Sequence, residues 1–325
     1  MASPPAQVSV TTPIQPAIER AKRLLFQPFD LGKWFAIAFC AWLAHLGEGG
    51  YAYSARLPGR FPSSLGIPRV PDSSSWTGPG AGWEQVRDEV TRNLYWIVPL
   101  AVAFAVLIVV LGLLMVWLSS RGEFMFLHCV ALDRAEVAVP WRQHAAKARS
   151  LFLFRLAVGL IAMVPILLLL AIIGFAVVRI FRQGDIEQVA WLPLITAGLA
   201  LVAVGLVFAI VAKLTRDLVV PIMFLRGGTC REAWSELLGL FAGRFHLLIV
   251  YLLFQIVLGL AIGIGILVIV IATCCLAGCL LILPYLGTVA LLPVLVFQRA
   301  YSLYYLAQLG PRYDLFQAAA PPPVK

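Results

Sequence analysis

Charged residues are scarce in this chain of 325 residues, because Asp, Glu, Lys and Arg together make up only 13% of it. A water-soluble domain usually contains about twice that share, roughly 25%. Hydrophobic residues instead make up 61% of the chain, which excludes a disordered protein as well as a soluble globular one. We therefore expect an all-α integral membrane protein whose structural units are membrane-spanning helices.

Catalytic and metal-binding motifs are also missing. The sequence contains no GxSxG, HExxH or Walker A pattern, which are short motifs that carry nucleophilic, zinc or phosphate chemistry. The six cysteines lie mostly in apolar stretches, which excludes a disulfide framework. Cys274, Cys275 and Cys279 are close enough to share a soft metal ion but have no fourth ligand nearby, so packing is the favoured interpretation. We predict a protein without enzymatic activity, cofactor or metal.

Six apolar runs predict six transmembrane helices, because a helix needs about 20 apolar residues to cross the hydrocarbon core of a bilayer. The run over 96–118 carries no charge and is bracketed by Trp96 and Trp117, aromatic residues that favour the membrane surface. The region 245–298 is too long for one helix, and we divide it at a turn near residues 273–278, with Pro284 opening the last helix. The first predicted helix begins at Trp34. The other five are 96–118, 156–178, 192–212 and the two helices of 245–298.

Lys and Arg are divided unevenly between the two sets of flanking segments. Of the 25 basic residues, 18 lie on the side that holds both termini and 7 on the other side. Because cytoplasmic segments are enriched in Lys and Arg, we place both termini in the cytoplasm and the chain in the inner membrane of a bacterium. The net charge of +9 is then mainly a topology signal and does not require a nucleic-acid partner.

The predicted transmembrane domain covers 34–310, between a cytoplasmic segment at 1–33 and a cytoplasmic tail at 311–325. The loop 49–92 is rich in Gly, Pro and Ser, so we expect it to be flexible and to lie on the extracytoplasmic side. A lid over a substrate site is the alternative interpretation of this loop. Residues 83–93 are predicted to form a short helix before the second span.

A short motif occurs twice, as Phe124–Leu127 and, 98 residues later, as Ile222–Leu225. Each copy is followed by a Trp-containing amphipathic stretch that leads into the next span, and 17–35 has the same character before the first span. We therefore predict three units, each an interfacial helix followed by a transmembrane hairpin. Such a basic and aromatic cytoplasmic collar either anchors the bundle or binds anionic lipid or a membrane partner. The candidate head-group contacts are Arg20, Lys22, Arg23, Arg142, Lys147 and Arg149.

A few polar residues lie in or beside the apolar runs, where they are energetically costly. His45 and Glu48 are three residues apart, hence on one helix face, and both are expected near the outer end of the first span. Arg155 is expected at the cytoplasmic end of the third span, and Gln255 lies in the fifth. These four residues are our candidate intramembrane polar site. The alternative is that Glu48 faces solvent and that Arg155 extends to the membrane surface.

Several segments resemble a group of uncharacterised bacterial multi-pass membrane proteins; they are 25–35, 41–44, 46–50, 121–127 and 150–154. The layout of the chain is also similar to the six-helix membrane domain that accompanies some bacterial glycerophosphodiester phosphodiesterases. This second likeness covers spacing alone, and the phosphodiesterase domain with its acidic metal ligands has no counterpart here. Neither resemblance implies a known activity.

The favoured function is therefore to bind or organise lipid or a membrane partner through the cytoplasmic collar. The partners considered are anionic membrane lipid, another membrane protein and a second copy of the chain. The alternative is a small-solute or ion transporter or channel that uses the polar site near the outer end of the first helix.

Overall fold

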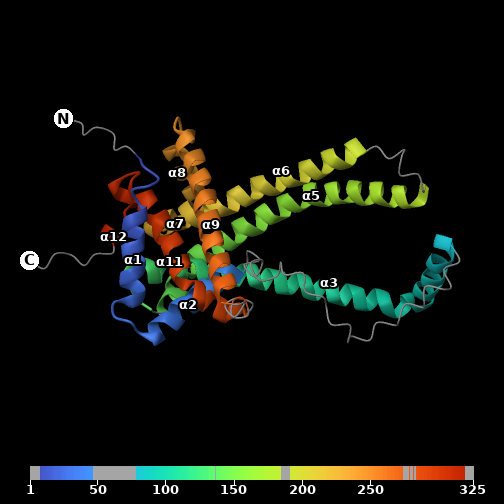
Figure 1. The fold of residues 1–325 in the computed structure, drawn as a ribbon, viewed down its shortest axis with the longest axis horizontal. Coiled ribbons are helices and arrows are strands. Elements are labelled where there is room, and N and C mark those ends of the chain that lie inside the picture. The colour runs from blue at the N-terminus through green and yellow to red at the C-terminus, as the bar shows by residue number, and fades with distance from the viewer. Residues whose placement is uncertain are drawn as a thin grey trace, which may run out of the picture. The chain divides into compact units, whose positions relative to one another are not determined.

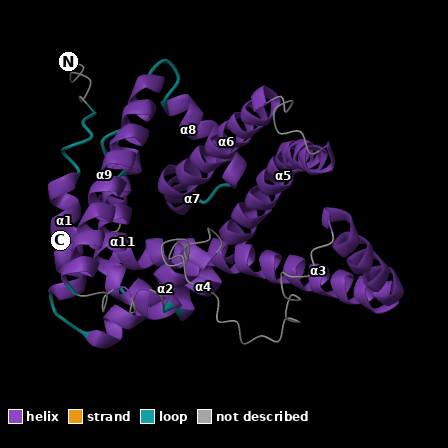
Figure 2. Cartoon of the chain, turned by 45° about the vertical axis from the view of Figure 1, so that its right-hand side comes forward, coloured by secondary structure: helices purple, strands orange, loops and turns teal. Residues whose placement is uncertain are grey.

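The computed structural model describes residues 8–46, 78–135, 137–183, 191–273, 278, 281 and 283–318, and within these residues it contains helices and no strand (Figures 1 and 2). The chain forms two compact units, one of residues 1–51 and 116–325 and one of residues 52–115. The first helices are α1 (Ile14–Phe26), α2 (Leu31–His45), α3 (Gly78–Leu132), α4 (Ala138–Gln143), α5 (Ala145–Gln183) and α6 (Trp191–Leu214). The π-helix η5 (Thr215–Val219), α7 (Val220–Arg226), α8 (Cys230–Leu240), α9 (Phe245–Ala272), α11 (Pro284–Ala307), the 3₁₀-helix η6 (Pro311–Tyr313) and α12 (Leu315–Ala318) follow.

Five helical segments are long and apolar enough to cross a membrane: Val98–Leu132, Ala145–Ala176, Leu194–Arg226, Phe245–Ala272 and Tyr285–Ala307. This confirms the all-α class and the multiple spans. The sixth predicted span is not confirmed, because α2 has 15 residues and is therefore about 22 Å long, short of the roughly 30 Å hydrocarbon core. Residues 47–77, which would have to complete it, lie outside the described residues.

The helix ends agree with several predictions and extend others. α9 ends at Ala272 and α11 begins at Pro284, where the sequence predicted a turn and a new helix. The stretch 83–93 is helical as predicted, but it belongs to one continuous helix of 55 residues, α3. The α3 segment Val98–Leu132 contains 35 residues and is about 52 Å long, so it is longer than a bilayer is thick.

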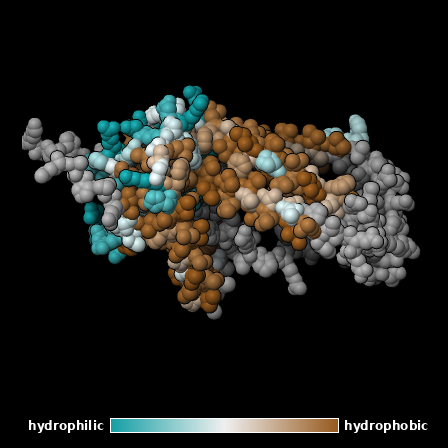
Figure 3. Space-filling view, turned by 90° about the horizontal axis from the view of Figure 1, so that it is seen from above, coloured by the Kyte–Doolittle hydropathy of each residue, from teal (hydrophilic) through white to brown (hydrophobic). Residues whose placement is uncertain are grey.

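Apolar side chains are exposed along the spans. Leu160 on α5, Leu206 on α6 and Leu267 on α9 are all more than half exposed. In Figure 3 hydrophobic side chains cover these helices, whereas hydrophilic ones gather where Figure 1 places α1 and α12. α5 and α6 lie side by side as a hairpin. Exposed apolar faces of this extent suit helices whose solvent is lipid.

The buried core of the first unit lies where the spans end. The last turns of α3, the first turns of α5, and η5 with α7 are enclosed there by α1, α2, α8 and the end of α11. The approach of α2 to α3 is very close at Gly122, since a Cβ there would lie 2.4 Å from the Ala44 nitrogen. Fully buried large side chains include Phe124, Leu127, Leu151, Leu218, Ile222 and Tyr301.

Two of the three predicted amphipathic stretches contain the helices α1 and α8, whereas the stretch 140–150 is divided at His144 between α4 and α5. Their buried faces, with Ala17 and Leu24 on α1 and Ala233 and Leu237 on α8, belong to the protein core. The sequence predicted interfacial helices, whose apolar faces enter lipid. Only part of each apolar surface stays exposed, as at Phe26, so packing on the bundle accounts for most of their amphipathic pattern.

Candidate functional site

A buried carboxylate holds three arginines together where the spans meet the core. Glu123 on α3 is 1% exposed. Its Oε1 atom lies 2.8 Å from Nε of Arg216 on η5 and 3.3 Å from Nη2 of Arg155 on α5. Its Oε2 atom lies 3.3 Å from Nη2 of Arg299 on α11. Because an unpaired buried charge is strongly destabilising, this arrangement requires all four helices to be in place.

The π-helix positions the second half of the site. η5 presents Arg216 and Asp217 as neighbours, and π-turns inside longer helices often occur at functional sites. Arg299 Nη1 donates a hydrogen bond to the Arg216 main-chain oxygen at 2.7 Å, which ties α11 to this turn. Asp217 forms an ion pair with Lys213 Nζ at 2.9 Å and accepts a hydrogen bond from the Tyr251 hydroxyl at 3.1 Å, so α9 is also connected.

A chain of hydrogen bonds joins the end of α2 to the same cluster. Arg155 Nη1 donates to Ser119 Oγ at 3.1 Å, and Ser119 Oγ donates to the Ala44 oxygen at 2.6 Å. The next residue, His45, has its Nδ1 atom 2.7 Å from the Ala41 oxygen.

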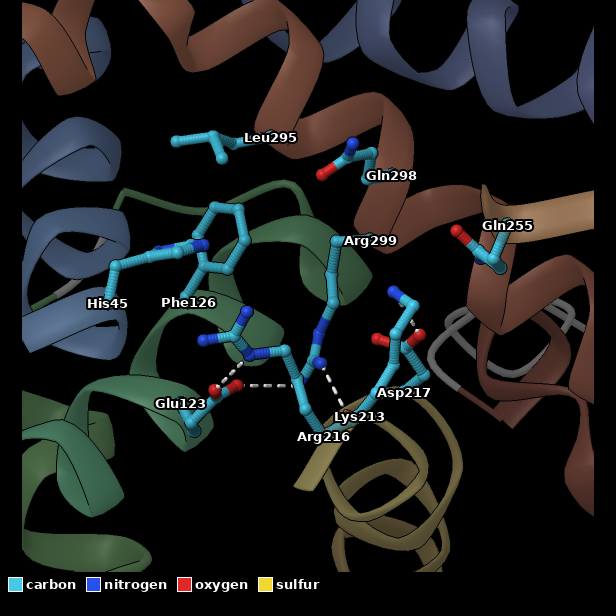
Figure 4. A pocket seen from close by; sticks show the side chains of 10 residues that line it. All are labelled: His45, Glu123, Phe126, Lys213, Arg216, Asp217, Gln255, Leu295, Gln298 and Arg299. Carbon is cyan, nitrogen blue, oxygen red and sulfur yellow. Dashed lines mark hydrogen bonds and ion pairs between the residues drawn. The ribbon is translucent and has the colours of Figure 1, made fainter. Parts of the chain in front are cut away.

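Ten residues of this region line a cavity of about 40 Å³ (Figure 4). Including Arg155, the site has four cationic side chains and two carboxylates, a formal net charge of +2. Arg299 is 4% exposed, and its Nε atom has no hydrogen-bond partner among the described residues. An anion is the ligand class that such a site suits. The cavity is lined by His45, Glu123, Phe126, Lys213, Arg216, Asp217, Gln255, Leu295, Gln298 and Arg299.

A protein-family model described as a family of unknown function, DUF7544, matches residues 8–292. The chain belongs to this family. The matched region includes Glu123, Arg155 and Arg216 and ends before Arg299. Comparison with curated proteins and with solved structures finds no match. Membership agrees with the resemblance to uncharacterised multi-pass membrane proteins, and it adds no link to phosphodiesterase-associated domains.

Three of the four residues predicted as an intramembrane polar site lie at this cluster. His45 and Gln255 line the cavity, and Arg155 binds Glu123. Glu48 lies outside the described residues. His45 and Arg155 were predicted at opposite ends of their spans, but the hydrogen bonds of Ser119 to Arg155 and to Ala44, the neighbour of His45, bring these ends together.

Two of the central residues, Glu123 and Arg299, were not predicted from the sequence. Each leaves a signal that can be recognised in retrospect. Glu123 is the only carboxylate between residues 90 and 132, and Arg299 is the only Lys or Arg between residues 245 and 311. A single charge at the edge of an apolar run is costly unless it has a partner or a function.

The predicted collar residues divide into two groups. Arg20 donates to the oxygens of Val130 and Ala131 at the end of α3, and Lys147 donates to the Phe224 oxygen at the end of α7. These two side chains satisfy helix carboxyl ends that would otherwise lack donors. The remaining members of the collar have exposed side chains, namely Lys22, Arg23, Arg142 and Arg149.

The two copies of the repeated motif meet at a buried imidazole. The His144 ring centroid lies 6.1 Å from that of Phe124 and 4.9 Å from that of Phe224, one from each copy. His128 and Lys147 also face it. Burial, together with the charge of Lys147, lowers the pKa of His144 from 6.5 to about 4, so this histidine is neutral at pH 7.

Proposed function

We propose that this protein is a non-catalytic inner-membrane protein of a bacterium that binds anionic lipid head groups at the cytoplasmic ends of its spans. The observation that carries the proposal is the excess of positive charge in the cavity around Arg299 and Arg216. A site of this kind needs an anionic ligand to become electrically balanced, and anionic lipids, which make the cytoplasmic leaflet negatively charged, supply such a ligand at the membrane surface.

The position of the site along the helices supports a head-group ligand. On α5 the exposed Leu160 follows Arg155 by five residues, and on α6 the exposed Leu206 precedes Arg216 by ten. These intervals correspond to about 8 and 15 Å of helix. Arg155 and Arg216 each lie ten residues from the nearer end of their apolar spans, Ala145–Ala176 and Leu194–Arg226. The charged cluster therefore lies toward one end of both spans, which supports a ligand near the membrane surface.

The exposed collar residues are proposed to add weaker contacts. Lys22, Arg23, Arg142 and Arg149 lie on helices next to the core, and each basic residue near an anionic surface contributes about 1 kcal/mol of attraction. The division of basic residues along the sequence supports a cytoplasmic position for these side chains and for both termini.

The test is native mass spectrometry of protein purified with its lipids, comparing Arg299→Gln with Arg312→Gln. Both substitutions remove one positive charge, but Arg312 is exposed and does not line the cavity. We expect Arg299→Gln to lower the occupancy of anionic lipid and Arg312→Gln to leave it near the wild-type value. Lys213→Gln provides a second cavity variant, since Lys213 is 44% exposed at its side chain and is less important for folding. Unchanged occupancy in both cavity variants would contradict the proposal.

A small-anion transporter is the second candidate, and it is favoured by the neutral polar side chains in the cavity. Gln255, Gln298 and His45 all line it beside the cations, as expected for a site that must also release its ligand. Reconstituted vesicles separate the two functions. Anion flux that depends on Arg299, without retention of anionic lipid, would favour transport.

A further inference from the structure

We infer that the cavity around Arg299 takes the dianionic phosphate group of a phosphomonoester, carried by a lipid or free in solution, in preference to a monoanionic phosphodiester. This inference deepens the proposed function, on which it rests for the position of the cavity at the membrane surface. It follows from the charge of the site, from its size and from one unpaired donor.

The formal charge of the site matches a dianion. Four cations, Arg155, Lys213, Arg216 and Arg299, face the carboxylates of Glu123 and Asp217, which leaves a net charge of +2. A phosphate monoester carries about −1.5 to −2 charges at pH 7, whereas a phosphodiester carries one. Because uncompensated charge in a poorly hydrated site is costly, the monoester balances the site and the diester leaves about one charge unbalanced.

The space also suits a terminal phosphate. A cavity needs about 10–15 Å³ of space open to the centre of a water molecule for each group of that size. The cavity volume of about 40 Å³, measured in the same way, therefore holds about three such groups. A phosphate monoester presents three terminal oxygens of that size. A diester has only two, and its second ester link has to leave the cavity.

Arg299 supplies a donor that the protein itself does not use. Its Nη1 atom donates to the Arg216 oxygen and its Nη2 atom faces Glu123, but Nε has no hydrogen-bond partner among the described residues. A buried donor without an acceptor costs about 1–3 kcal/mol in general. A phosphate oxygen in the cavity would satisfy Nε, with Lys213 at the exposed edge of the site.

Glu123 acts in this scheme as an internal counter-ion. It binds Arg155, Arg216 and Arg299 at once, so it holds the guanidinium groups in position while it repels the ligand. Glu123→Gln keeps an acceptor for the arginines and raises the net charge of the site by one. We expect this variant to unfold at a lower temperature than wild type without ligand, and to be stabilised more by a phosphomonoester.

The experiment uses the full chain in nanodiscs of phosphatidylcholine, with phosphatidic acid as the monoester lipid and phosphatidylglycerol as the diester lipid. We expect wild type to bind phosphatidic acid about tenfold more tightly than phosphatidylglycerol. A tenfold difference in affinity corresponds to about 1.4 kcal/mol. The preference should disappear in Arg299→Gln, decrease in Lys213→Gln and persist in Arg312→Gln. If the Arg299 variant does not fold, Lys213→Gln and Glu123→Gln still decide the question.

Inorganic phosphate identifies the source of the ligand. Competition by millimolar phosphate against phosphatidic acid supports the site for either source, whereas phosphatidic acid binding without competition supports a lipid. Phosphate binding without phosphatidic acid binding supports the dianion site and contradicts the proposed lipid function. Equal affinity for the two lipids in wild type overturns the inference and leaves the proposed function intact. Binding of none of the three probes overturns both.

Discussion

At the scale of single residues, the cavity residues have contacts that hydropathy does not encode. Glu123 is separated from Arg155 by 32 positions and from Arg216 by 93. Arg155 and Gln255 were recognisable from the sequence because each lies inside an apolar run. Their partners were not, because the pairing depends on how helices from distant parts of the chain pack, and no local period records that.

His144 provides a pH test at the same scale. Its pKa in the folded protein is lowered from 6.5 to about 4, so between these values the unfolded chain binds the proton more readily. Stability should therefore be complete above about pH 6.5, fall as the pH decreases toward 4, and change no further from this group below that. The side chains that face the imidazole are Phe124, His128, Lys147 and Phe224, and none of them is acidic.

The measurement is the unfolding temperature between pH 4 and pH 7.5 for His144→Phe, which keeps an aromatic ring and removes the titrating group. We expect a smaller decrease toward pH 4 than in wild type. His246→Phe is the matched control, since His246 is exposed, and it should retain the wild-type pH dependence. Identical curves for His144→Phe and wild type would show that this imidazole does not govern acid stability.

At the scale of helices, the sequence predicted most of the elements but not their packing. Apolar length identified α5 and α6, and with the turn signals before Pro284 it also identified α9 and α11, because each span is a local property of the chain. The end of α3 could not be predicted in the same way, since residues 119–131 are buried by α2 and other helices rather than by lipid. Hydropathy does not distinguish these two kinds of burial.

Gly122 tests the packing of α2 on α3. A Cβ atom there would lie 2.4 Å from the Ala44 nitrogen and 2.5 Å from the Leu43 carbonyl carbon, both of which are backbone atoms. Gly122→Ala should therefore force the helices apart and lower the free energy of unfolding by about 1–3 kcal/mol. Gly159→Ala is the control, because no atom lies within 4 Å of its Cβ position and alanine favours the helix.

Thermal unfolding of the two variants in the same detergent gives the comparison. We expect Gly122→Ala to unfold at a clearly lower temperature than wild type and Gly159→Ala to unfold at the same temperature or higher. If the order is reversed, the close contact between α2 and α3 is not part of the folded protein.

At the scale of the whole molecule, the two ends of the described chain are tied together. Ser9 exchanges two hydrogen bonds with the Gln308 side chain, and the Tyr301 hydroxyl donates to the Val10 oxygen at 2.7 Å. Residues that touch lie on one side of a membrane, so the chain between them must cross an even number of times. Five long spans are an odd number. Either the region of α2 and the residues after it supplies a sixth crossing, or one long helix does not cross.

Cysteine labelling distinguishes these topologies. In a cysteine-free background, single cysteines at Glu19, Gln317 and Ser74 are treated with a membrane-impermeant maleimide in right-side-out and inverted vesicles. Glu19 and Gln317 are exposed, and Ser74 lies outside the described residues. We expect Glu19 and Gln317 to react from the cytoplasmic side and Ser74 from the other side, because α2 with the following residues then completes a span.

Reaction of Ser74 from the same side as Glu19 would mean that α2 enters the bundle without crossing. His45 would then belong to a helix that ends at the cavity on the cytoplasmic side, and transport from the outer end of a first span would be excluded.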